Sequence, residues 1–422
     1  MEIKLLKDKI NNGGFDALFA ELYTENAAAR VRYSDSCDRF LEIFGEKDVE
    51  LFSAPGRTEV GGNHTDHQRG CVLAGSVDMD VIAVVAKNDN NIIRLKSHGY
   101  PMDTVDVTDL SVSQDEKGTS ASLIRGMAAI FAENGYKIGG FDAYTTSNVL
   151  KGSGLSSSAA FEVLVGCILN HLYNDGVLDA VKIAQFAQRA ECEFFGKPCG
   201  LMDQTASSVG GFTGIDFENP DSPIIEKVEF DLAKYGHSLC IVNTGGNHAD
   251  LTDDYAAVPA ECRAVANYFS KNYLREVCES DFYENIAALR EKVGDRAVLR
   301  ALHFFEDNRR AVLEKEALKK GDFERFLSLV NASGNSSFKY LQNVYSNADV
   351  TSQGISLALA LTEQFLGGAG ACRVHGGGFA GTIQAYVPNE MLDAYKAMIN
   401  KTFGEGNCHV LKIRKYGGIM IK

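Results

Sequence analysis

The chain has 422 residues, of which 45% are hydrophobic and 23% are charged, a composition typical of a globular protein with ample material for a core. Its formal net charge of −14 argues against a nucleic-acid-binding protein, because such proteins present a basic face. No apolar stretch reaches the length of a membrane-spanning helix, about 18 residues, and the N-terminal segment MEIKLLKDKINNGG lacks the apolar core of a signal peptide. The ten cysteines are scattered without a C-x-x-C pair. Together, these features predict a protein of the reducing cytoplasm with no nucleic-acid or membrane partner.

The first half of the chain mixes helical and strand patterns. The first fifty residues read as helical, and the β-branched run Met79–Lys87 (MDVIAVVAK) predicts a strand. Asn91–Ser97 follows after Asn-Asp-Asn, so the two runs are expected to form a hairpin. Ser122–Asn134 is predicted to be a helix that Gly135 ends, and Phe141–Val149 is predicted to be a strand.

The second half alternates predicted helices, Val298–Lys319 and Phe323–Ser333, with predicted strands, Gly381–Val387 and Cys408–Ile413. The chain contains no internal repeat and no low-complexity linker. The turn-rich stretch ENPDSP at Glu218–Pro223 is the expected boundary between two lobes, residues 1–222 and 223–422. The pattern predicts an α+β fold.

A serine cluster stands where a predicted strand gives way to a helix, in KGSGLSSSAA at residues 151–160. Phe161–Tyr173 is apolar almost all round, which predicts a buried helix. The free N–H groups and the positive dipole end of such a helix favour an anion, and glycines let a phosphate approach the backbone. The stretch is not a Walker A loop, and a plain Gly/Ser turn that caps a core helix is the alternative.

A carboxylate faces inward on the predicted helix Leu178–Phe195. At about 100° per residue, Glu191 shares an apolar face with Ala184 and Phe194, whereas Glu193 lies on the opposite, charged side. A carboxylate on an apolar face needs a partner or a metal ion. Magnesium in phosphoryl-transfer sites suits such a group, and a buried Glu–Arg pair is the alternative.

Two further stretches concentrate polar side chains near glycines. Asp203 lies in CGLMDQTAS, where it is either an inward base or an ordinary surface carboxylate. In APGRTEVGGNHTDHQRG, residues 54–70, planar hydrogen-bonding groups suit the recognition of sugar hydroxyls. The alternatives there are a metal site made by His64, Asp66 and His67, or a solvated polar loop.

Four motifs together resemble one known family. APGR…HTD, KGSGLSSSA, CGLMDQ and RVHGGGFAG occur in the order typical of the GHMP small-molecule kinases, and the first and third resemble the galactokinase branch in particular. The resemblance runs from about Phe52 to the C-terminus. It implies a two-lobed fold, with an N-terminal α/β lobe, a C-terminal α+β lobe and the active site in the cleft between them.

The resemblance also implies an activity, the ATP- and Mg²⁺-dependent phosphorylation of D-galactose to galactose 1-phosphate. Asp203 matches the catalytic aspartate and Arg57 the arginine beside it. The residues that match ATP-binding positions are Lys151, Gly152, Ser153, Gly154, Leu155, Ser156, Ser157 and Ser158, and those that match magnesium ligands are Ser157, Ser158 and Glu191. The expected sugar-binding residues are Glu59, Asn63, His64, Asp66, Gly200 and Tyr255, and the C-terminal glycine motif is Gly376, Gly377, Gly378 and Gly381.

The first motif departs from the family pattern. The usual signature reads GRVNLIGEHTDYN, whereas this chain reads GRTEVGGNHTDHQ, so that Asn and Glu have exchanged places at Glu59 and Asn63. The resemblance implies that the residue at position 63 touches the far hydroxyl of the sugar. Either affinity for that hydroxyl falls, or Glu59 restores the carboxylate from four residues away.

Two other functions stay open at this point. The first is a GHMP kinase for a related sugar, such as galactosamine, a uronic acid or arabinose. The second is a catalytically silent sensor that binds galactose and ATP, although the serine cluster, Glu191, Asp203 and Arg57 are all present. The family tendency is monomeric, so we expect a monomer whose small-molecule partner is a sugar.

Overall fold

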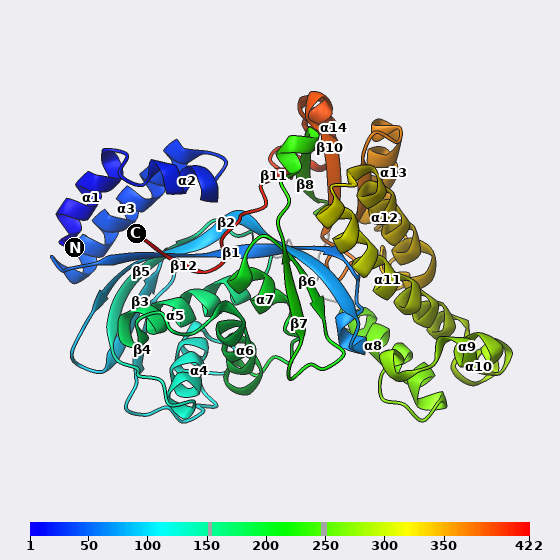
Figure 1. Ribbon diagram of the computed structural model, residues 1–422, viewed down its shortest axis with the longest axis horizontal. Helices are drawn as coiled ribbons and strands as arrows, with labels where there is room; N and C mark the ends of the chain where they lie inside the picture. Colours follow the sequence, from blue (N-terminus) through cyan, green and yellow to red (C-terminus); the bar gives the residue numbers. More distant parts are fainter. Residues whose placement is uncertain (151–153, 246–250) are drawn as a thin grey trace.

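The structure is a computed structural model that describes residues 1–150, 154–245 and 251–422. Three residues of the predicted ATP-binding loop, Lys151, Gly152 and Ser153, lie outside the described residues. The chain forms a large curved sheet with helices on both faces and a smaller sheet covered by further helices (Figure 1). The α+β class predicted from the sequence is confirmed.

The first part of the chain carries helices on both sides of the larger sheet. These helices are α1 Ile3–Asn11, α2 Asp16–Leu22, α3 Asn26–Phe44, α4 Ser120–Glu133, α5 Ser157–Asn174, α6 Ala180–Ala190 and α7 Met202–Val209. Its strands are β1 Glu50–Gly61, β2 Cys71–Lys87, β3 Ile92–Ser97, β4 Met102–Asp106, β5 Phe141–Ser147, β6 Phe212–Asp216 and β7 Ile224–Val228. The predicted helices and strands of this part are confirmed, except that the strand predicted over Met79–Lys87 begins eight residues earlier, at Cys71.

The remaining part of the chain is mainly helical. Its helices are α8 Thr252–Tyr268, α9 Glu279–Glu284, α10 Ile286–Val293, α11 Asp295–Lys320, α12 Phe323–Ser336, α13 Gly354–Leu366 and α14 Leu392–Phe403. Its strands are β8 His237–Asn243, β9 Ala371–His375, β10 Thr382–Pro388, β11 Cys408–Leu411 and β12 Ile419–Ile421. The smaller sheet has the order β11-β8-β10-β9.

The larger sheet has the order β12-β1-β2-β5-β3-β4, with β6 also paired to β2 and β7 paired to β6. The predicted hairpin between Met79–Lys87 and Asn91–Ser97 is therefore wrong. The strand β5 lies between them, antiparallel to β2 and parallel to β3. The turn residues after β2 were read correctly, but the partner of a strand is a long-range choice that local turn chemistry does not specify.

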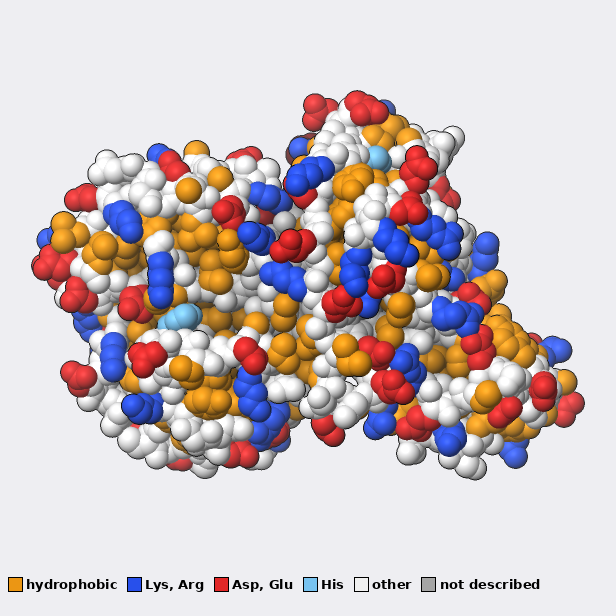
Figure 2. Space-filling view, in the orientation of Figure 1, with side chains coloured by type: hydrophobic (Ala, Val, Ile, Leu, Met, Phe, Trp, Pro, Cys, Tyr) orange, Lys and Arg blue, Asp and Glu red, His pale blue; other side chains and the backbone are white. Residues whose placement is uncertain are grey.

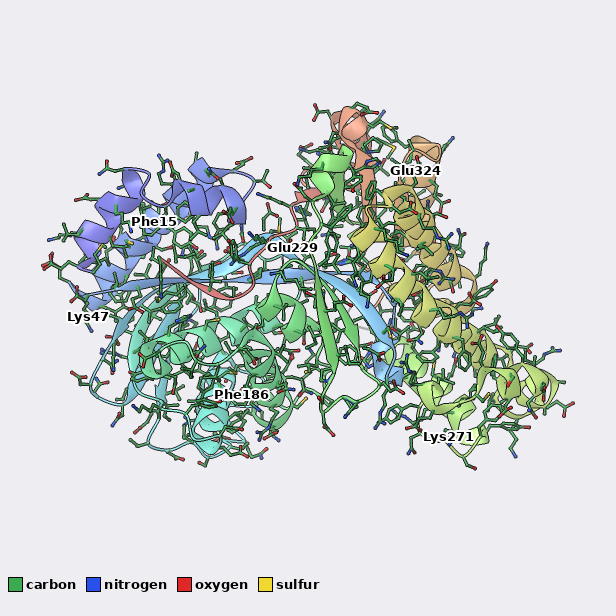
Figure 3. All side chains as sticks on the ribbon, viewed as in Figure 1. Phe15, Lys47, Phe186, Glu229, Lys271 and Glu324 are labelled. Atoms are coloured by element: carbon green, nitrogen blue, oxygen red, sulfur yellow. The ribbon has the colours of Figure 1, made fainter. Side chains whose placement is uncertain are left out.

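Strand β2 supplies side chains to two separate hydrophobic cores. Val81, Ala83 and Val85 belong to the core that includes α4–α6, whereas Ile82 and Val84 belong to the core beneath α1–α3. Because successive strand residues point to opposite faces, burial of both faces requires a continuous apolar run. Figure 3 shows the result, with Phe15 among the N-terminal helices and Phe186 in the helical layer on the other face of the sheet.

The predicted boundary between residues 222 and 223 falls in the turn between β6 and β7, which pair with each other over Phe212–Asp216 and Ile224–Val228. At the other end of the chain, β12 returns to pair with β1 (Figure 1). The larger sheet thus contains strands from both sides of the predicted boundary. The division of the chain into two lobes at this point stays a prediction.

Acidic and basic side chains are interspersed on the face drawn in Figure 2, where hydrophobic side chains also reach the surface. No described helix combines the length and the apolar composition that a membrane crossing requires.

Candidate active site

An irregularity in β1 sets the position of Arg57. The pairing of β1 with β2 shifts register between Pro55 and Arg57, and a bulge of this kind re-aims a side chain. The Nε and Nη2 atoms of Arg57 each lie 2.7 Å from Oδ1 of Asp203, at the start of α7. Arg57 also donates to the backbone carbonyl of Gly154. The bulge therefore brings the two predicted catalytic residues and the serine loop together.

Asp203 is accessible and ionised at once. Its side chain is 31% exposed, in contact with Arg57 and with the Ser156 hydroxyl, which donates to it. Burial opposes ionisation, but the charge of Arg57 and these hydrogen bonds outweigh it and hold the pKa of Asp203 below its ordinary value. An ionised carboxylate with an open side can accept a proton from a hydroxyl.

The serine cluster lies at the open end of a helix, as predicted. Helix α5 begins at Ser157, and its N-cap residue Ser156 has a left-handed backbone (φ 55°) and makes no capping bond to the first turn. The backbone N–H of Arg57 donates to the carbonyl of Leu155 at 2.9 Å, which fixes the loop against β1. The first-turn N–H groups and the helix dipole are thus positioned to attract an anion.

Glu191 faces the interior from a π-helical turn, Glu191–Phe195, that follows α6, which confirms the orientation predicted from periodicity. Its carboxylate accepts from Gln204 Nε2 at 2.8 Å and Lys197 Nζ at 3.0 Å, with Ser158 Oγ at 3.4 Å. Its cationic partner is therefore a lysine, largely exposed, rather than the arginine of the alternative interpretation.

A second buried carboxylate, Glu162, lies in the same region and was not predicted. Gln204 bridges the two acids, since its Nε2 lies 3.1 Å from Oε2 of Glu162 and 2.8 Å from Glu191. Oε1 of Glu162 has no hydrogen-bond partner among the described residues, and burial together with the charge of Glu191 raises its pKa well above the ordinary value. The apolar pattern of Phe161–Tyr173 predicts a buried helix, and the single acidic residue within it, Glu162, is the signal that indicates a buried carboxylate there.

These oxygen atoms suit a hard cation shared with phosphates. Hydroxyl and carboxylate oxygens are the ligands that Mg²⁺ takes alongside phosphates and water, and Ser158, Glu191 and the unpartnered Glu162 oxygen are of that kind. Among the described residues, no three His, Cys, Asp or Glu side chains form a metal cluster. The alternative metal site at His64, Asp66 and His67 is therefore not found.

Three of the predicted sugar-binding residues, Asn63, His64 and Tyr255, contact the C-terminal glycine motif. His64 Nε2 lies 2.9 Å from the carbonyl of Gly377, and the Tyr255 hydroxyl donates to Gly378 at 2.8 Å. Burial, helped by the charge of His67, lowers the pKa of His64 to about 4, so its imidazole is neutral. A Cβ at Gly377 would stand 2.6 Å from the Tyr255 ring. Only glycine fits there.

The same contacts join parts of the chain that are far apart in sequence. A Cβ at Gly376 would lie 3.8 Å from the Cα of Gly154, so the glycine motif touches the serine loop. Gly378 (φ 80°) and Gly381 (φ 97°) adopt left-handed backbone conformations that favour glycine. A Cβ at Gly200 would stand 2.9 Å from Oδ2 of Asp66. Among the described residues, the structure thus joins the glycine motif to the serine loop at Gly154, and Gly200 to Asp66.

Glu59 and Asn63 have polar atoms that face the interior. Asn63 is 0% exposed, and its side-chain amide donates to Oε1 of Glu59 and to the carbonyl of Gly376, both at 2.8 Å. The same Glu59 oxygen accepts from Arg373 Nη2 at 2.6 Å. The carboxylate that Glu59 was expected to offer to a sugar is therefore bound to a buried arginine.

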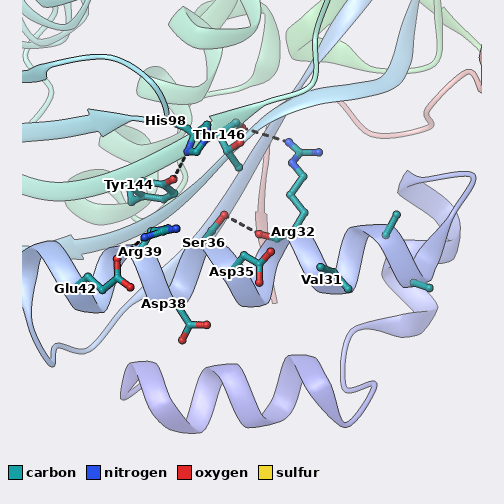
Figure 4. A pocket seen from close by; sticks show the side chains of 12 residues that line it. Val31, Arg32, Asp35, Ser36, Asp38, Arg39, Glu42, His98, Tyr144 and Thr146 are labelled. Atoms are coloured by element: carbon teal, nitrogen blue, oxygen red, sulfur yellow. Dashed lines mark hydrogen bonds and ion pairs between the residues drawn. The ribbon is translucent and has the colours of Figure 1, made fainter. Parts of the chain in front are cut away.

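Two hollows show how the site relates to the rest of the surface. One of about 390 Å³ is lined by Asp66, Gly200 and Leu201 together with α6. A larger one of about 820 Å³ lies between α3 and the end of β5, where His98 Nδ1 and the Tyr144 hydroxyl are 2.9 Å apart (Figure 4). None of the predicted site residues that the structure describes lines the larger hollow.

Comparison with known proteins agrees with these motifs. Residues 122–211 match the family model "GHMP kinases N terminal domain", and residues 38–87 match the "Galactokinase galactose-binding signature". The galactokinase of Enterococcus faecalis is 31% identical over 375 residues, which cover 87% of this chain and 92% of that protein. The chain belongs to the galactokinase family. The galactokinase of Streptomyces coelicolor is 30% identical, with the same coverage.

Solved structures of galactokinase and of other GHMP kinases share this fold. The structure of Lactococcus lactis galactokinase complexed with galactose matches with a TM-score of 0.76 at 24% identity, covering 92% of this chain and 99% of that one. The mevalonate kinase of Methanococcus jannaschii matches with a TM-score of 0.62 at 14% identity, covering 87% and 98%. The family, the fold and the sugar-kinase class predicted from the sequence are confirmed, and the chain is a phosphotransferase that uses ATP.

Proposed function

We propose that this chain transfers the γ-phosphoryl group of ATP to the C1 hydroxyl of D-galactose, giving galactose 1-phosphate and ADP. The observation that carries the proposal is the contact of Asp203 with Arg57 beside the open N-terminus of α5. A base, a cation and an anion site in one place are what phosphoryl transfer to a hydroxyl requires. The galactokinase relatives support galactose as the sugar.

Each group has a distinct part in the reaction. The ionised carboxylate of Asp203 accepts a hydrogen bond from the attacking hydroxyl and takes its proton as the new P–O bond forms. Arg57 keeps Asp203 ionised and offers positive charge to the phosphoryl group. The N–H groups of the first turn of α5 hold phosphate oxygens, and the loop residues from Lys151 to Ser158 are proposed to surround them.

The residues present fit a magnesium ion that arrives with the nucleotide. Ser158 and Glu191 would hold it, with Ser157 at the same helix end, and it would neutralise charge on the phosphates. In this structure, Lys197 forms an ion pair with Glu191. Because the Lys197 side chain is 61% exposed, it can turn into solvent when a magnesium ion binds Glu191.

The position of the new phosphate tests the proposal directly. We expect ³¹P NMR of a mixture of protein, Mg-ATP and galactose to show a sugar phosphate whose phosphorus couples to the C1 proton. The Asp203→Asn variant should yield at most about a hundredth as much in the same time, whereas the matched surface change Asp8→Asn on α1 should leave the yield unchanged. Phosphate at another carbon would overturn the assignment of the acceptor.

A related sugar is the second candidate, because Asn63 stands where the family signature has glutamate. A silent sensor fits less well, since a sensor has no need of the contact between Arg57 and Asp203. ATP turnover with and without sugar distinguishes a sensor from both kinases.

We also propose that the protein is a monomer in the cytoplasm. All ten cysteines are free thiols, which suits a reducing compartment. Light scattering during gel filtration should give the mass of one chain, and a mass of two chains would refute the monomer.

A further inference from the structure

Arg373 on β9 is a fully buried arginine whose guanidinium is held at three points. It donates to the carbonyl of Val374 at 3.0 Å, to the carbonyl of Val60 at 2.5 Å and to Oε1 of Glu59 at 2.6 Å. Two of these bonds reach β1 at Glu59 and Val60, within its second register shift, which runs from Glu59 to Gly61. A guanidinium held in this way has little freedom to turn, so it fixes the position of β1 at Glu59 and Val60.

Asn63 is saturated with hydrogen bonds in the same interior. Its amide donates to Glu59 and to Gly376, and its side-chain oxygen accepts from Asn343 at 2.8 Å and Ser337 at 3.2 Å. A side-chain amide has two N–H donors and two acceptor positions, and all four are in use. No capacity remains for a sugar hydroxyl.

The backbone of Asn63 is held as firmly as its side chain. Its N–H donates to Asp307 Oδ2 at 2.9 Å, and its carbonyl lies 2.9 Å from His303 Nε2. The next residue, His64, has a left-handed backbone (φ 59°) and reaches the carbonyl of Gly377. Asn343 Nδ2 reaches that same carbonyl at 3.2 Å. Asn63 therefore fixes both the loop that carries His64 and the glycine motif opposite it.

From these contacts we infer that Arg373, Glu59 and Asn63 are positioning residues, which set the shape of the sugar site without touching the sugar. The inference rests on the proposed function, because the site that they position is the sugar site. On this view, the exchange of Glu59 and Asn63 alters the residues that hold the walls of the sugar site in place, and does not alter the contacts with a sugar hydroxyl. Sugar selectivity then comes from the residues that contact the sugar, which are proposed to include His64 and Asp66.

With Glu59 in place, the charges in this interior balance only if residue 63 is neutral. The carboxylates of Glu59 and Asp307 face the cations Arg373 and Arg310. A third acid, Glu314, has both oxygens unpartnered among the described residues, and burial followed by the charge of Asp307 raises its pKa well above the ordinary value. With Glu314 neutral, two negative charges meet two positive ones. A glutamate at position 63 would add a charge without a counter-ion.

The matching experiment is a double-mutant cycle that exchanges the two residues. The variant Asn63→Glu adds a carboxylate, Glu59→Asn leaves Arg373 without its acid, and the double variant keeps one carboxylate and one amide that are hydrogen-bonded to each other. We expect each single change to lower the urea midpoint of unfolding and to cut kcat/KM for galactose by about 10- to 100-fold, because the pocket shifts. We expect the double variant to recover most of both losses. Losses that simply add would overturn the pairing.

A selectivity ratio separates positioning from direct contact. 6-Deoxygalactose lacks the hydroxyl at C6, the far hydroxyl of the sugar. If residue 63 does not touch this hydroxyl, Asn63→Glu should lower kcat/KM for galactose and for 6-deoxygalactose by the same factor. A change in the ratio of the two would overturn the inference, because it would place that hydroxyl against residue 63. The KM for ATP is expected to stay constant in all variants. A general loss of folded protein would also leave this KM unchanged, but kcat/KM for galactose would then not recover in the double variant.

A milder variant covers the case in which the single exchanges do not fold. Ser337→Ala removes one donor to Asn63 and little volume, and we expect kcat/KM for galactose to fall by roughly 3- to 10-fold. The control Ser36→Ala removes an equally buried hydroxyl on α3, and we expect no change. Equal activity of both variants would overturn the inference. If the unaltered protein turns over no sugar, the proposed function fails, while the coupling in urea midpoints still decides whether the three residues act together.

Discussion

Two arginine–carboxylate pairs in this protein have opposite electrostatic outcomes. Arg57 and Asp203 are 9% and 31% exposed, whereas Arg373 and Glu59 are 0% and 6% exposed. The N–O distances are nearly equal, 2.7 and 2.6 Å. Yet burial raises the pKa of Glu59 despite Arg373, while Arg57 and Ser156 overcome burial and lower the pKa of Asp203.

The comparison teaches that an ion pair is not by itself a sign of catalysis. The Asp203 carboxylate keeps an open side and stays ionised, so it can act as a base. The Glu59 carboxylate is buried, and its Oε1 atom accepts hydrogen bonds from both Arg373 and Asn63. It can therefore hold these groups in place but cannot take a proton from a substrate. In the proposed mechanism, Arg57 takes part in the reaction, whereas Glu59, in the same signature, only holds the pocket in shape.

The largest effect is expected from Asp203→Asn, which removes the proposed base without changing its shape. We expect kcat to fall by about 10²- to 10⁴-fold, since this is the usual contribution of a positioned base. Binding of a non-hydrolysable ATP analogue, measured by calorimetry, should change little. A variant that keeps most of its kcat would remove the distinction between the two pairs.

Arg57→Gln should cost less, roughly 10²-fold in kcat/KM, because one stabilising charge is lost. It should also move the acid limb of the pH profile. Asp203 must be ionised to act, and Arg57 helps to hold its pKa below the ordinary value of an aspartate, so the unaltered protein should stay active at acid pH. In the variant the decline should begin at higher pH. An acid limb that does not move would mean that Arg57 does not control Asp203.

Much of the region around Asp203 and the serine cluster was predictable from the sequence, whereas the hydrogen-bond network around Arg373 was not. The serine cluster predicted the start of α5, and the 3.6-residue period predicted that Glu191 faces the interior. Arg373 stands inside the quoted motif RVHGGGFAG, but its contact with Glu59 joins strands more than 300 residues apart, and no local pattern specifies that. Glu162 was missed because one acid in an apolar run does not alter the periodicity.

A smaller effect is expected from Glu191→Gln. The amide keeps the shape but loses a charged ligand, so the Mg²⁺ concentration that gives half-maximal activity should rise by about tenfold or more. Titration of activity with Mg²⁺ at fixed ATP gives the value, with the exposed change Glu193→Gln as control. Equal rises in both variants would contradict a specific role for Glu191.

The smallest effect concerns stability alone and sharpens the account of the buried region. Glu314 has a raised pKa in the folded protein, so the unfolded chain releases its proton first as the pH rises above 4.5, and stability falls from there until the folded group ionises. Glu314→Gln removes that loss. We expect the stability of the variant relative to the unaltered protein to grow with pH, by about tenfold in the unfolding constant per pH unit in that window. Parallel stability curves would contradict a neutral Glu314.

The most direct test is the initial rate of ADP release from Mg-ATP with a panel of sugars: galactose, talose, galactosamine, N-acetylgalactosamine, galacturonate, arabinose and glucose. The account predicts rapid turnover with galactose, because it assigns residue 63 to the support of the pocket and leaves sugar contact to the proposed residues His64 and Asp66, which match the family signature. Turnover with another sugar and none with galactose would contradict it, and would make the exchange of Glu59 and Asn63 the determinant of specificity.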